Sequence, residues 1–153
     1  MNVPFGPDAL SKMIAHGERD YPSEACGLVF EGPAGERVVE VANVVDRYHA
    51  RDPERFPRTA RTAYLLDPKA QLEALESADA AGEKLAVVYH SHTDVGAYFS
   101  EEDRAQALSA GGEPLLPGVE YLVLSVRAGR CDALECFRYE GGRWLQRTLA
   151  LPR

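Results

Sequence analysis

The sequence predicts one α/β (α+β) domain, spanning residues 1–153, in which a mixed β-sheet packs between helices. Two observations lead to this prediction. The length of 153 residues suits a single domain. Some predicted strands follow one another directly, and others are separated by helices. Strict alternation of strand and helix would indicate a fully parallel sheet, so this order indicates a mixed one.

The first third of the chain contains a predicted helix followed by a predicted hairpin. Residues 7–20 have apolar side chains at helical spacing, and Asp8 is available to cap the first turn. Residues 25–32 form a short apolar run, and residues 36–45 have the valine content of a strand. Because only residues 33–35 join them, the two strands are expected to pair as a hairpin.

Residues 46–61 are expected to form a long surface loop. Pro53, Pro57 and the polar residues around them resist regular structure. Loops of this length are uncommon in compact domains and tend to be functional or disordered. A short strand is expected at residues 62–66, where the chain becomes apolar again.

The clearest helix signal in the sequence covers residues 67–82. Asp67 can cap its start, Pro68 suits the first helical position, and Gly82 suits its end. The remaining predicted elements are strands at 84–92 and 119–126, a helix at 100–112 capped by Ser100, and a hairpin of strands 131–139 and 143–149.

The composition excludes several broad classes of function. A formal net charge of −7 argues against a general nucleic-acid binder, and no apolar run approaches the length of a transmembrane helix. The first residues lack the basic and apolar regions of a secretory signal, so we expect a cytoplasmic protein. Cys26, Cys131 and Cys136 form no paired pattern and are expected to be small buried side chains rather than disulfides.

One segment carries a charge opposite to that of the whole chain. From Arg47 to Arg61, five arginines are offset only by Asp52 and Glu54, which leaves a local charge of +3. The segment is either a solvated loop that offsets the acidic surface or a binding loop that docks an acidic surface or a C-terminal tail of a partner. The sequence leaves both interpretations open.

A metal site is predicted at the end of strand 84–92. Side chains alternate along a strand, so His90 and His92 share one face and Ser91 points to the other. Asp103, in the first turn of the following helix, can fold back as a third ligand. Two imidazoles and one carboxylate leave one coordination position open to water, which is the pattern of a catalytic zinc site.

Such a site needs two further groups. Zinc lowers the pKa of its bound water to about 7, and a carboxylate that is not a ligand is needed as the general base. A hydrogen-bond donor is also needed for the oxyanion of the tetrahedral intermediate.

The spacing of these residues resembles a known metalloprotease signature. The His-Ser-His of residues 90–92, seven further residues, and then Ser100-x-x-Asp103 match the H-S/T-H-x7-S-x-x-D pattern of the JAMM, or MPN-plus, family (JAB domain). The segment YPSEACGLVFEG, which contains Glu24, resembles the bacterial form of the upstream glutamate segment of that family. The resemblance extends from about the first predicted helix to the last predicted strand.

The resemblance implies a role for each of these residues. His90, His92 and Asp103 would hold one Zn2+ ion per chain. Glu24 would act as the general base and Ser100 would stabilise the oxyanion. The implied fold is similar to that of cytidine deaminases, and the implied reaction is hydrolysis of an amide or isopeptide bond, typically after the C-terminal Gly-Gly of a ubiquitin-like or sulfur-carrier protein.

Two positions depart from the family pattern. Many members have proline where this chain has Thr93 and Phe99, which bears on the shape of the loop and on substrate preference rather than on the ligands. The chain also lacks the long insertions of eukaryotic deubiquitinases, so it resembles the compact bacterial type. His16 and His49 have no evident partner in the sequence and are expected to lie on the surface.

Two alternative functions are compatible with the same fold. A zinc amidohydrolase acting on a small-molecule or peptide amide would use the same site. A non-catalytic MPN scaffold would have a broken signature, whereas every position is filled here. The chain lacks the P-C-x-x-C segment of zinc deaminases, the H-E-x-x-H motif of other zinc proteases, and the G-x-S-x-G motif of α/β-hydrolases.

Overall fold

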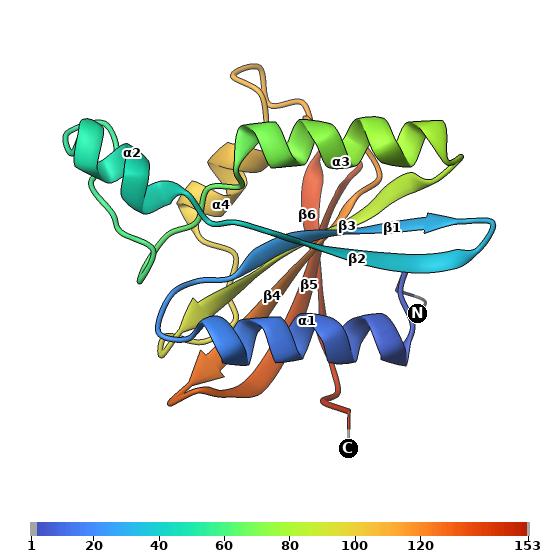
Figure 1. Ribbon diagram of the computed structural model, residues 1–153, viewed down its shortest axis with the longest axis horizontal. Coiled ribbons are helices and arrows are strands. Elements are labelled where there is room, and N and C mark those ends of the chain that lie inside the picture. Colours follow the sequence, from blue (N-terminus) through green and yellow to red (C-terminus); the bar gives the residue numbers. More distant parts are fainter. Residues whose placement is uncertain (1–2, 153) are drawn as a thin grey trace.

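The computed structural model describes residues 3–152, which contain a six-stranded mixed sheet (Figure 1). Its strands are β1 Cys26–Gly32, β2 Gly35–Val41, β3 Lys84–Thr93, β4 Glu120–Arg127, β5 Arg130–Glu140 and β6 Arg143–Leu149. The order across the sheet is β2-β1-β3-β4-β5-β6. β3 and β4 pair in parallel, and every other neighbouring pair is antiparallel. The prediction of a mixed sheet is confirmed.

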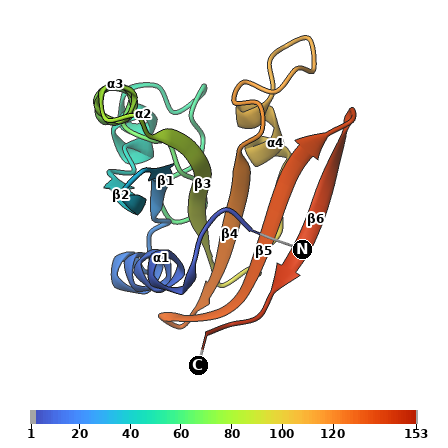
Figure 2. The same cartoon turned by 90° about the vertical axis from the view of Figure 1, so that its right-hand side faces the viewer.

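Helices cover both faces of this sheet. In the described residues they are α1 Pro7–Asp20, α2 Val45–Arg51, α3 Pro68–Ala80 and α4 Glu101–Ala107. α1 lies against one face, and α3 lies along the other (Figures 1 and 2). The side chains on the two faces form two separate apolar clusters, and the second cluster includes residues of α4. The sheet is therefore packed between helices, as predicted.

The central strand β3 contributes to both clusters. Val87 and Tyr89 belong to the cluster on the α1 side, and Val88 belongs to the cluster on the α3 side. Every residue of β3 from position 86 to 93 is buried, because β1 and β4 flank the strand and helices cover the sheet. His90 and His92 alternate with the same period as Val88 and so face the α3 side.

Residues 46–61 do not form the continuous loop that the prolines predict. α2 occupies Val45–Arg51, and the chain is irregular only after it. Val45 is buried, and the ring of Tyr48 packs edge-on against that of Phe56 at 5.2 Å between centroids. Tertiary contacts therefore stabilise a short helix that has little apolar periodicity of its own.

The strand predicted at residues 62–66 is also wrong. In its place the chain makes a single antiparallel bridge between Asn43 and Leu66. The N–H of Leu65 donates to the Oδ1 atom of Asn43 at 3.0 Å. A side-chain acceptor has therefore replaced the backbone partner that a strand would use.

Two of the three predicted helix caps are confirmed. The side chains of Asp67 and Ser100 accept backbone N–H groups at the starts of α3 and α4. Asp8 does not cap α1, because Gly6 occupies the cap position and Asp8 already lies in the first turn. α4 ends at Ala107, earlier than the predicted glycine stop, because the next residue is extended.

The prediction that His16 lies on the surface is wrong, and His49 is only partly exposed. His16 is 3% exposed, and its ring nitrogens lie 2.7 Å from the Oη of Tyr89 and 3.0 Å from a carboxylate oxygen of Asp20. His49 is half-buried, and its Nδ1 lies 2.7 Å from the carbonyl oxygen of Phe56. Packing of a distant strand supplies Tyr89, whereas Asp20 and Phe56 are close in sequence to the histidines that they contact.

The structure also bears on the predictions about disulfides and about membrane-spanning helices. Cys26, Cys131 and Cys136 are free thiols, of which the first and last are buried and the second is half-buried. Across residues 3–152, none of the helices combines the length and the apolar character that crossing a membrane requires.

Gly27→Ala should destabilise the fold. A Cβ atom at Gly27 would lie 2.4 Å from the Oη of Tyr89, whose buried ring is held by His16. Overpacking of this kind costs about 1–3 kcal/mol, which urea unfolding would report as a lower midpoint. Gly111→Ala is the control, because a Cβ there meets only an ordinary contact at 3.9 Å. Equal midpoints for the two variants would contradict the clash.

Candidate metal centre and active site

β3 delivers two buried histidines to one end of the sheet. His90 is 0% exposed and His92 is 4% exposed. Ser91 points to the other face, where its Oγ accepts the backbone N–H of Ala25 at 2.8 Å. The structure brings the two imidazoles together as the alternation predicts, with 3.2 Å between their Nε2 atoms.

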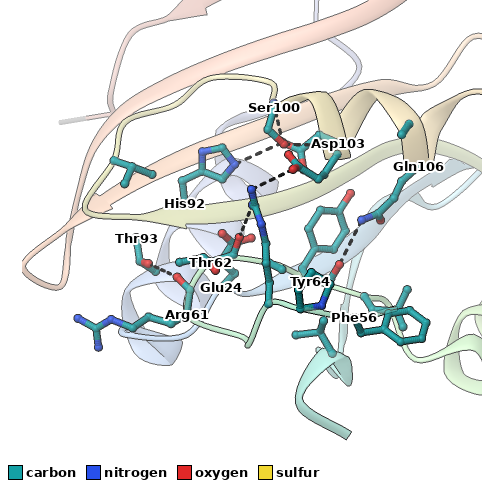
Figure 3. A pocket seen from close by; sticks show the side chains of 18 of the residues that line it. Glu24, Phe56, Arg61, Thr62, Tyr64, His92, Thr93, Ser100, Asp103 and Gln106 are labelled. Carbon is teal, nitrogen blue, oxygen red and sulfur yellow. Dashed lines mark hydrogen bonds and ion pairs between the residues drawn. The ribbon is translucent and has the colours of Figure 1, made fainter. Parts of the chain in front are cut away.

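α4 carries Asp103 to the same point (Figure 3). Ser100 and Asp103 form a reciprocal capping box, in which each backbone N–H donates to the side chain of the other residue at 3.0 Å. The box aims the carboxylate at the histidines. Its Oδ2 atom lies 3.2 Å from the Nε2 of His90 and 3.3 Å from the Nε2 of His92.

These three atoms have the spacing of a tetrahedral metal site. The two nitrogens and the oxygen form a triangle with edges of 3.2, 3.2 and 3.3 Å. Zinc bound to such atoms at about 2.0–2.1 Å in tetrahedral geometry separates them by about 3.3–3.4 Å. The spacing therefore fits a tetrahedral metal ion such as zinc, which His90, His92 and Asp103 would hold with three protein ligands.

The protonation states also suit metal binding. Burial lowers the pKa of His90, which favours the neutral imidazole. Burial alone would raise the pKa of Asp103, but the histidines and the N–H of Ser100 outweigh burial and hold that pKa well below its usual range. The Nδ1 of His92 lies 3.0 Å from the carbonyl oxygen of Gly96. A proton on Nδ1 would serve that bond and leave the Nε2 lone pair for the metal.

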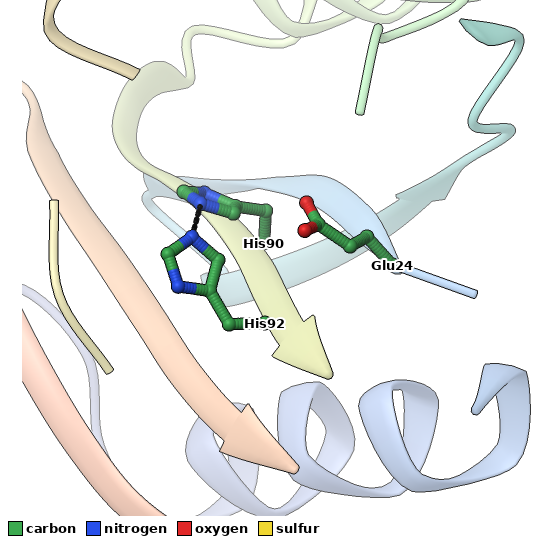
Figure 4. A group of neighbouring side chains, drawn as sticks. All are labelled: Glu24, His90 and His92. Atoms are coloured by element: carbon green, nitrogen blue, oxygen red, sulfur yellow. Dashed lines mark hydrogen bonds between the residues drawn. The ribbon is translucent and has the colours of Figure 1, made fainter. Parts of the chain in front are cut away.

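Glu24 lies beside the same centre (Figure 4). One of its carboxylate oxygens and one ring nitrogen from each of His90 and His92 all lie within 4.8 Å of one another. The carboxylate of Asp103 is within hydrogen-bond distance of both rings, and Glu24 supplies a second carboxylate close to the same two histidines. Burial raises the pKa of Glu24 to about 9, the charge of Asp103 adds to this effect, and Arg58 opposes it.

Asn43 holds Glu24 in place, and sequence reasoning does not identify it. Its Nδ2 donates to the carbonyls of Glu24 and Ala63 at 2.9 and 3.0 Å. Its Oδ1 accepts the N–H groups of Val45 and Leu65 at 3.2 and 3.0 Å. Every hydrogen-bonding position of this amide is therefore used. The only signal in the sequence is one polar residue within an apolar run.

A pocket of about 660 Å³ opens over the centre. Glu24, His92, Ser100 and Asp103 line it (Figure 3), and His90 is fully buried next to them. The Oγ of Ser100 accepts the N–H of Asp103, so its own proton is free to donate elsewhere. Four of the five residues predicted from the sequence therefore line one cavity, and the fifth, His90, contacts two of them, His92 and Asp103.

The two departures from the family pattern have structural roles. The Oγ1 of Thr93 donates to the carbonyl of Arg61 at 2.6 Å, which joins the end of β3 to the arginine-rich segment. Phe99 is buried and stacks on Phe137 at 4.9 Å, with Trp144 edge-on at 4.7 Å. Thr93 also lines the pocket, whereas Phe99 belongs to the apolar cluster of the core, directly before Ser100 in the chain.

Comparison with known sequences gives one consistent group of relatives. A family model described as prokaryotic homologues of the JAB domain matches residues 7–138. A CysO-cysteine peptidase of Mycobacterium tuberculosis is 34% identical over 139 residues, which cover 88% of this chain and 81% of the relative. A desampylase of Haloferax volcanii is 32% identical, covering 77% of this chain and 76% of the relative. A probable TtuB-protein conjugate cleaving protease of Thermus thermophilus is 35% identical, covering 69% and 62%.

Solved structures agree in fold. A solution structure of a Desulfitobacterium hafniense protein matches with a TM-score of 0.65 and 21% identity, over 95% of this chain and 90% of that one. A solution structure of a Salinibacter ruber protein matches with a TM-score of 0.58 and 28% identity, over 99% and 91%. The α+β architecture is therefore shared with experimentally determined structures.

Asn43→Ala should destabilise the protein without removing a metal ligand. The truncation leaves two carbonyls and two N–H groups without their side-chain partner, and we expect a loss of about 2–4 kcal/mol in the free energy of unfolding. Gln106→Ala is the control, because Gln106 makes one long bond of 3.4 Å to the carbonyl of Tyr64. Urea unfolding measures both losses. An Asn43→Ala loss no larger than that of Gln106→Ala would rule out the proposed role of the amide.

Proposed function

The chain belongs to the prokaryotic homologues of the JAB domain, and from this premise we propose that it is a zinc-dependent peptidase. Its reaction is hydrolysis of the amide bond after the C-terminal Gly-Gly of a ubiquitin-like or sulfur-carrier protein. The observation that carries the proposal is the convergence of His90, His92 and Asp103 on one point, with Glu24 beside it.

The metal we propose is Zn2+, one ion per chain. His90, His92 and Asp103 would hold it through two ring nitrogens and one carboxylate oxygen. When bound, zinc polarises a carbonyl oxygen and lowers the pKa of a water molecule to about 7. The spacing of the three atoms and the neutral state favoured for His90 support this assignment.

Glu24 is the general base of the proposed mechanism. Its carboxylate takes one proton from the attacking water while the water oxygen bonds to the carbonyl carbon. The same proton passes to the leaving nitrogen as the C–N bond breaks. Without a metal, burial raises the pKa of Glu24 to about 9 and so favours its protonated form at neutral pH. The positive charge of a bound Zn2+ ion would lower this pKa and favour the carboxylate form that can accept the proton.

Ser100 is the oxyanion donor of the proposed mechanism. Negative charge develops on the carbonyl oxygen as the water adds, and a preorganised donor at that point stabilises it. The hydroxyl oxygen of Ser100 is fixed by the N–H of Asp103, so its proton can be directed into the pocket.

The names of the relatives support the proposed substrate. They describe a CysO-cysteine peptidase, a desampylase and a protease that cleaves TtuB-protein conjugates. Ubiquitin-like and sulfur-carrier proteins are the class to which these substrates belong. A second candidate, hydrolysis of a small-molecule or peptide amide, is favoured by the pocket volume of about 660 Å³, which lies within the range of small-ligand sites.

We further propose that the chain acts as one catalytic domain in the cytoplasm. The described residues share a single sheet. Three free thiols suit a reducing compartment.

Metal analysis of protein purified without chelators should find one zinc per chain. His92→Ala and Asp103→Ala each remove one of three ligands, so both variants should lose the metal. Asp79→Ala, at an exposed position of α3, should retain it and serves as the control. Full zinc occupancy in both ligand variants would refute the assignment.

Glu24→Gln should keep the zinc and lose turnover. The carboxamide has nearly the same shape but cannot take the proton, so kcat on a peptide ending in a Gly-Gly aminocoumarin amide should fall by about 10²–10⁴-fold. Glu101→Gln, exposed on α4, is the matched control. Wild-type turnover in Glu24→Gln would mean that Glu24 is not the base. Hydrolysis of small amides by the wild type, with none of the Gly-Gly substrate, would favour the second candidate.

A further inference from the structure

Arginines of the segment after α2 form part of the wall of the active-site pocket. Arg55, Arg58 and Arg61 all line it, together with the site residues. The chain as a whole carries a formal net charge of −7. Three carboxylates, those of Glu24, Glu102 and Asp103, line the same pocket, so the three arginines balance them there, in contrast to the net negative charge of the whole chain.

Within residues 3–152, two of these arginines form no ion pair at 4.0 Å or less, although the charge of Arg61 helps to lower the pKa of Asp94. Arg58 pairs with Glu102 at 2.9 Å and donates to the carbonyl of Thr62 at 3.1 Å. Arg55 and Arg61 are exposed, and neither forms an ion pair within 4.0 Å with any residue from 3 to 152. If the segment only neutralised surface carboxylates, its arginines would form ion pairs with them. Of the three arginines that line the pocket, only Arg58 forms such a pair within residues 3–152.

The two unpaired arginines are nonetheless held in position. The guanidinium of Arg55 lies over the ring of Phe56, 5.3 Å from its centroid. The carbonyl of Arg61 accepts the Oγ1 proton of Thr93, the residue that follows the second histidine (Figure 3). The backbone of Arg61 is thus connected directly to the strand that carries the metal ligands.

The same pocket has an apolar part. Val95 and Tyr98 are 55% and 50% exposed, and both line it. The ring of Tyr98 packs edge-on against that of His92, at 4.6 Å between centroids. Exposed apolar side chains and unpaired cations around one opening suit a peptide segment that carries both apolar and acidic side chains.

We propose that Arg55 and Arg61 select substrates whose tail carries acidic side chains in the few residues before the Gly-Gly pair. This inference rests on the proposed function, because it assumes that a tail crosses the pocket to reach the metal centre. Arg55 and Arg61 line the same pocket as the site residues, so an extended tail that ends at the site brings the side chains just before the Gly-Gly pair past the pocket walls. A tail with basic side chains at those positions is repelled by the same two arginines.

Binding and cleavage can be measured separately. Four fluorescent peptides share the Gly-Gly amide and differ in the neighbouring residues: acidic, neutral or basic before Gly-Gly, and acidic only after the scissile bond. Dissociation constants are measured by fluorescence anisotropy on the zinc-loaded Glu24→Gln protein, which does not turn the peptides over. Cleavage of the same peptides by the zinc-loaded wild type is followed in parallel.

The acidic-tail peptide should bind about tenfold more tightly than the neutral one at low ionic strength, and the basic one more weakly still. The preference should shrink in 0.5 M salt. Introducing Arg55→Glu and Arg61→Glu into the Glu24→Gln protein should abolish or reverse the preference for the acidic tail. Adding Lys84→Glu and Arg143→Glu makes the same change in net charge at exposed positions away from the pocket lining and should leave the preference intact.

The outcomes distinguish this inference from the proposed function. Equal affinities for the acidic and neutral tails, or a preference only for the peptide with acid after the scissile bond, would overturn the selection by Arg55 and Arg61. An acidic preference that survives Arg55→Glu and Arg61→Glu would overturn it as well. Acid-dependent binding without cleavage by the wild type would support the selection and refute the proposed function.

Discussion

The burial of β3 between β1 and β4 is the constraint on which the metal centre depends. β4 pairs with the strand through Thr93 and β1 pairs with it as far as His90, so its register is fixed from two sides. A shift of one residue would turn Ser91 toward the centre and both histidines away from it. Pairing of the central strand therefore converts a spacing of two residues into a distance of 3.2 Å between the ring nitrogens of His90 and His92.

The other groups at the site are oriented by hydrogen bonds to backbone. The capping box of α4 aims Asp103, the amide of Asn43 holds the backbone of Glu24, and the carbonyl of Gly96 orients His92. Each bond also gives a buried polar group a partner, which a stable fold requires. The residues that position the site are therefore also residues that stabilise the domain, and substitutions at them affect both properties.

Charge in the pocket is separated by depth. The carboxylates of Glu24 and Asp103 are buried beside the histidines, where a divalent cation can neutralise them. Arg55 and Arg61 are exposed along the wall, where they can attract an acidic peptide before it reaches the centre. Thr93 connects the two regions, because it follows the second histidine and binds the carbonyl of Arg61. Substrate selection and catalysis can thus be located on adjoining segments of one cavity.

The sequence by itself determined the features that depend on near neighbours along the chain. The alternation of β3, the cap at Ser100 and the spacing to Asp103 are local geometry, so they could be read from residue order. The resemblance to a family then singled out Glu24, which no local pattern distinguishes. Only the tertiary structure decided that residues 46–61 begin in a helix, that His16 is buried against Tyr89, and that an asparagine holds the backbone of Glu24, the proposed general base. The physical reason is that a buried polar group takes its partner from whichever distant segment packs against it, and that choice belongs to the assembled core.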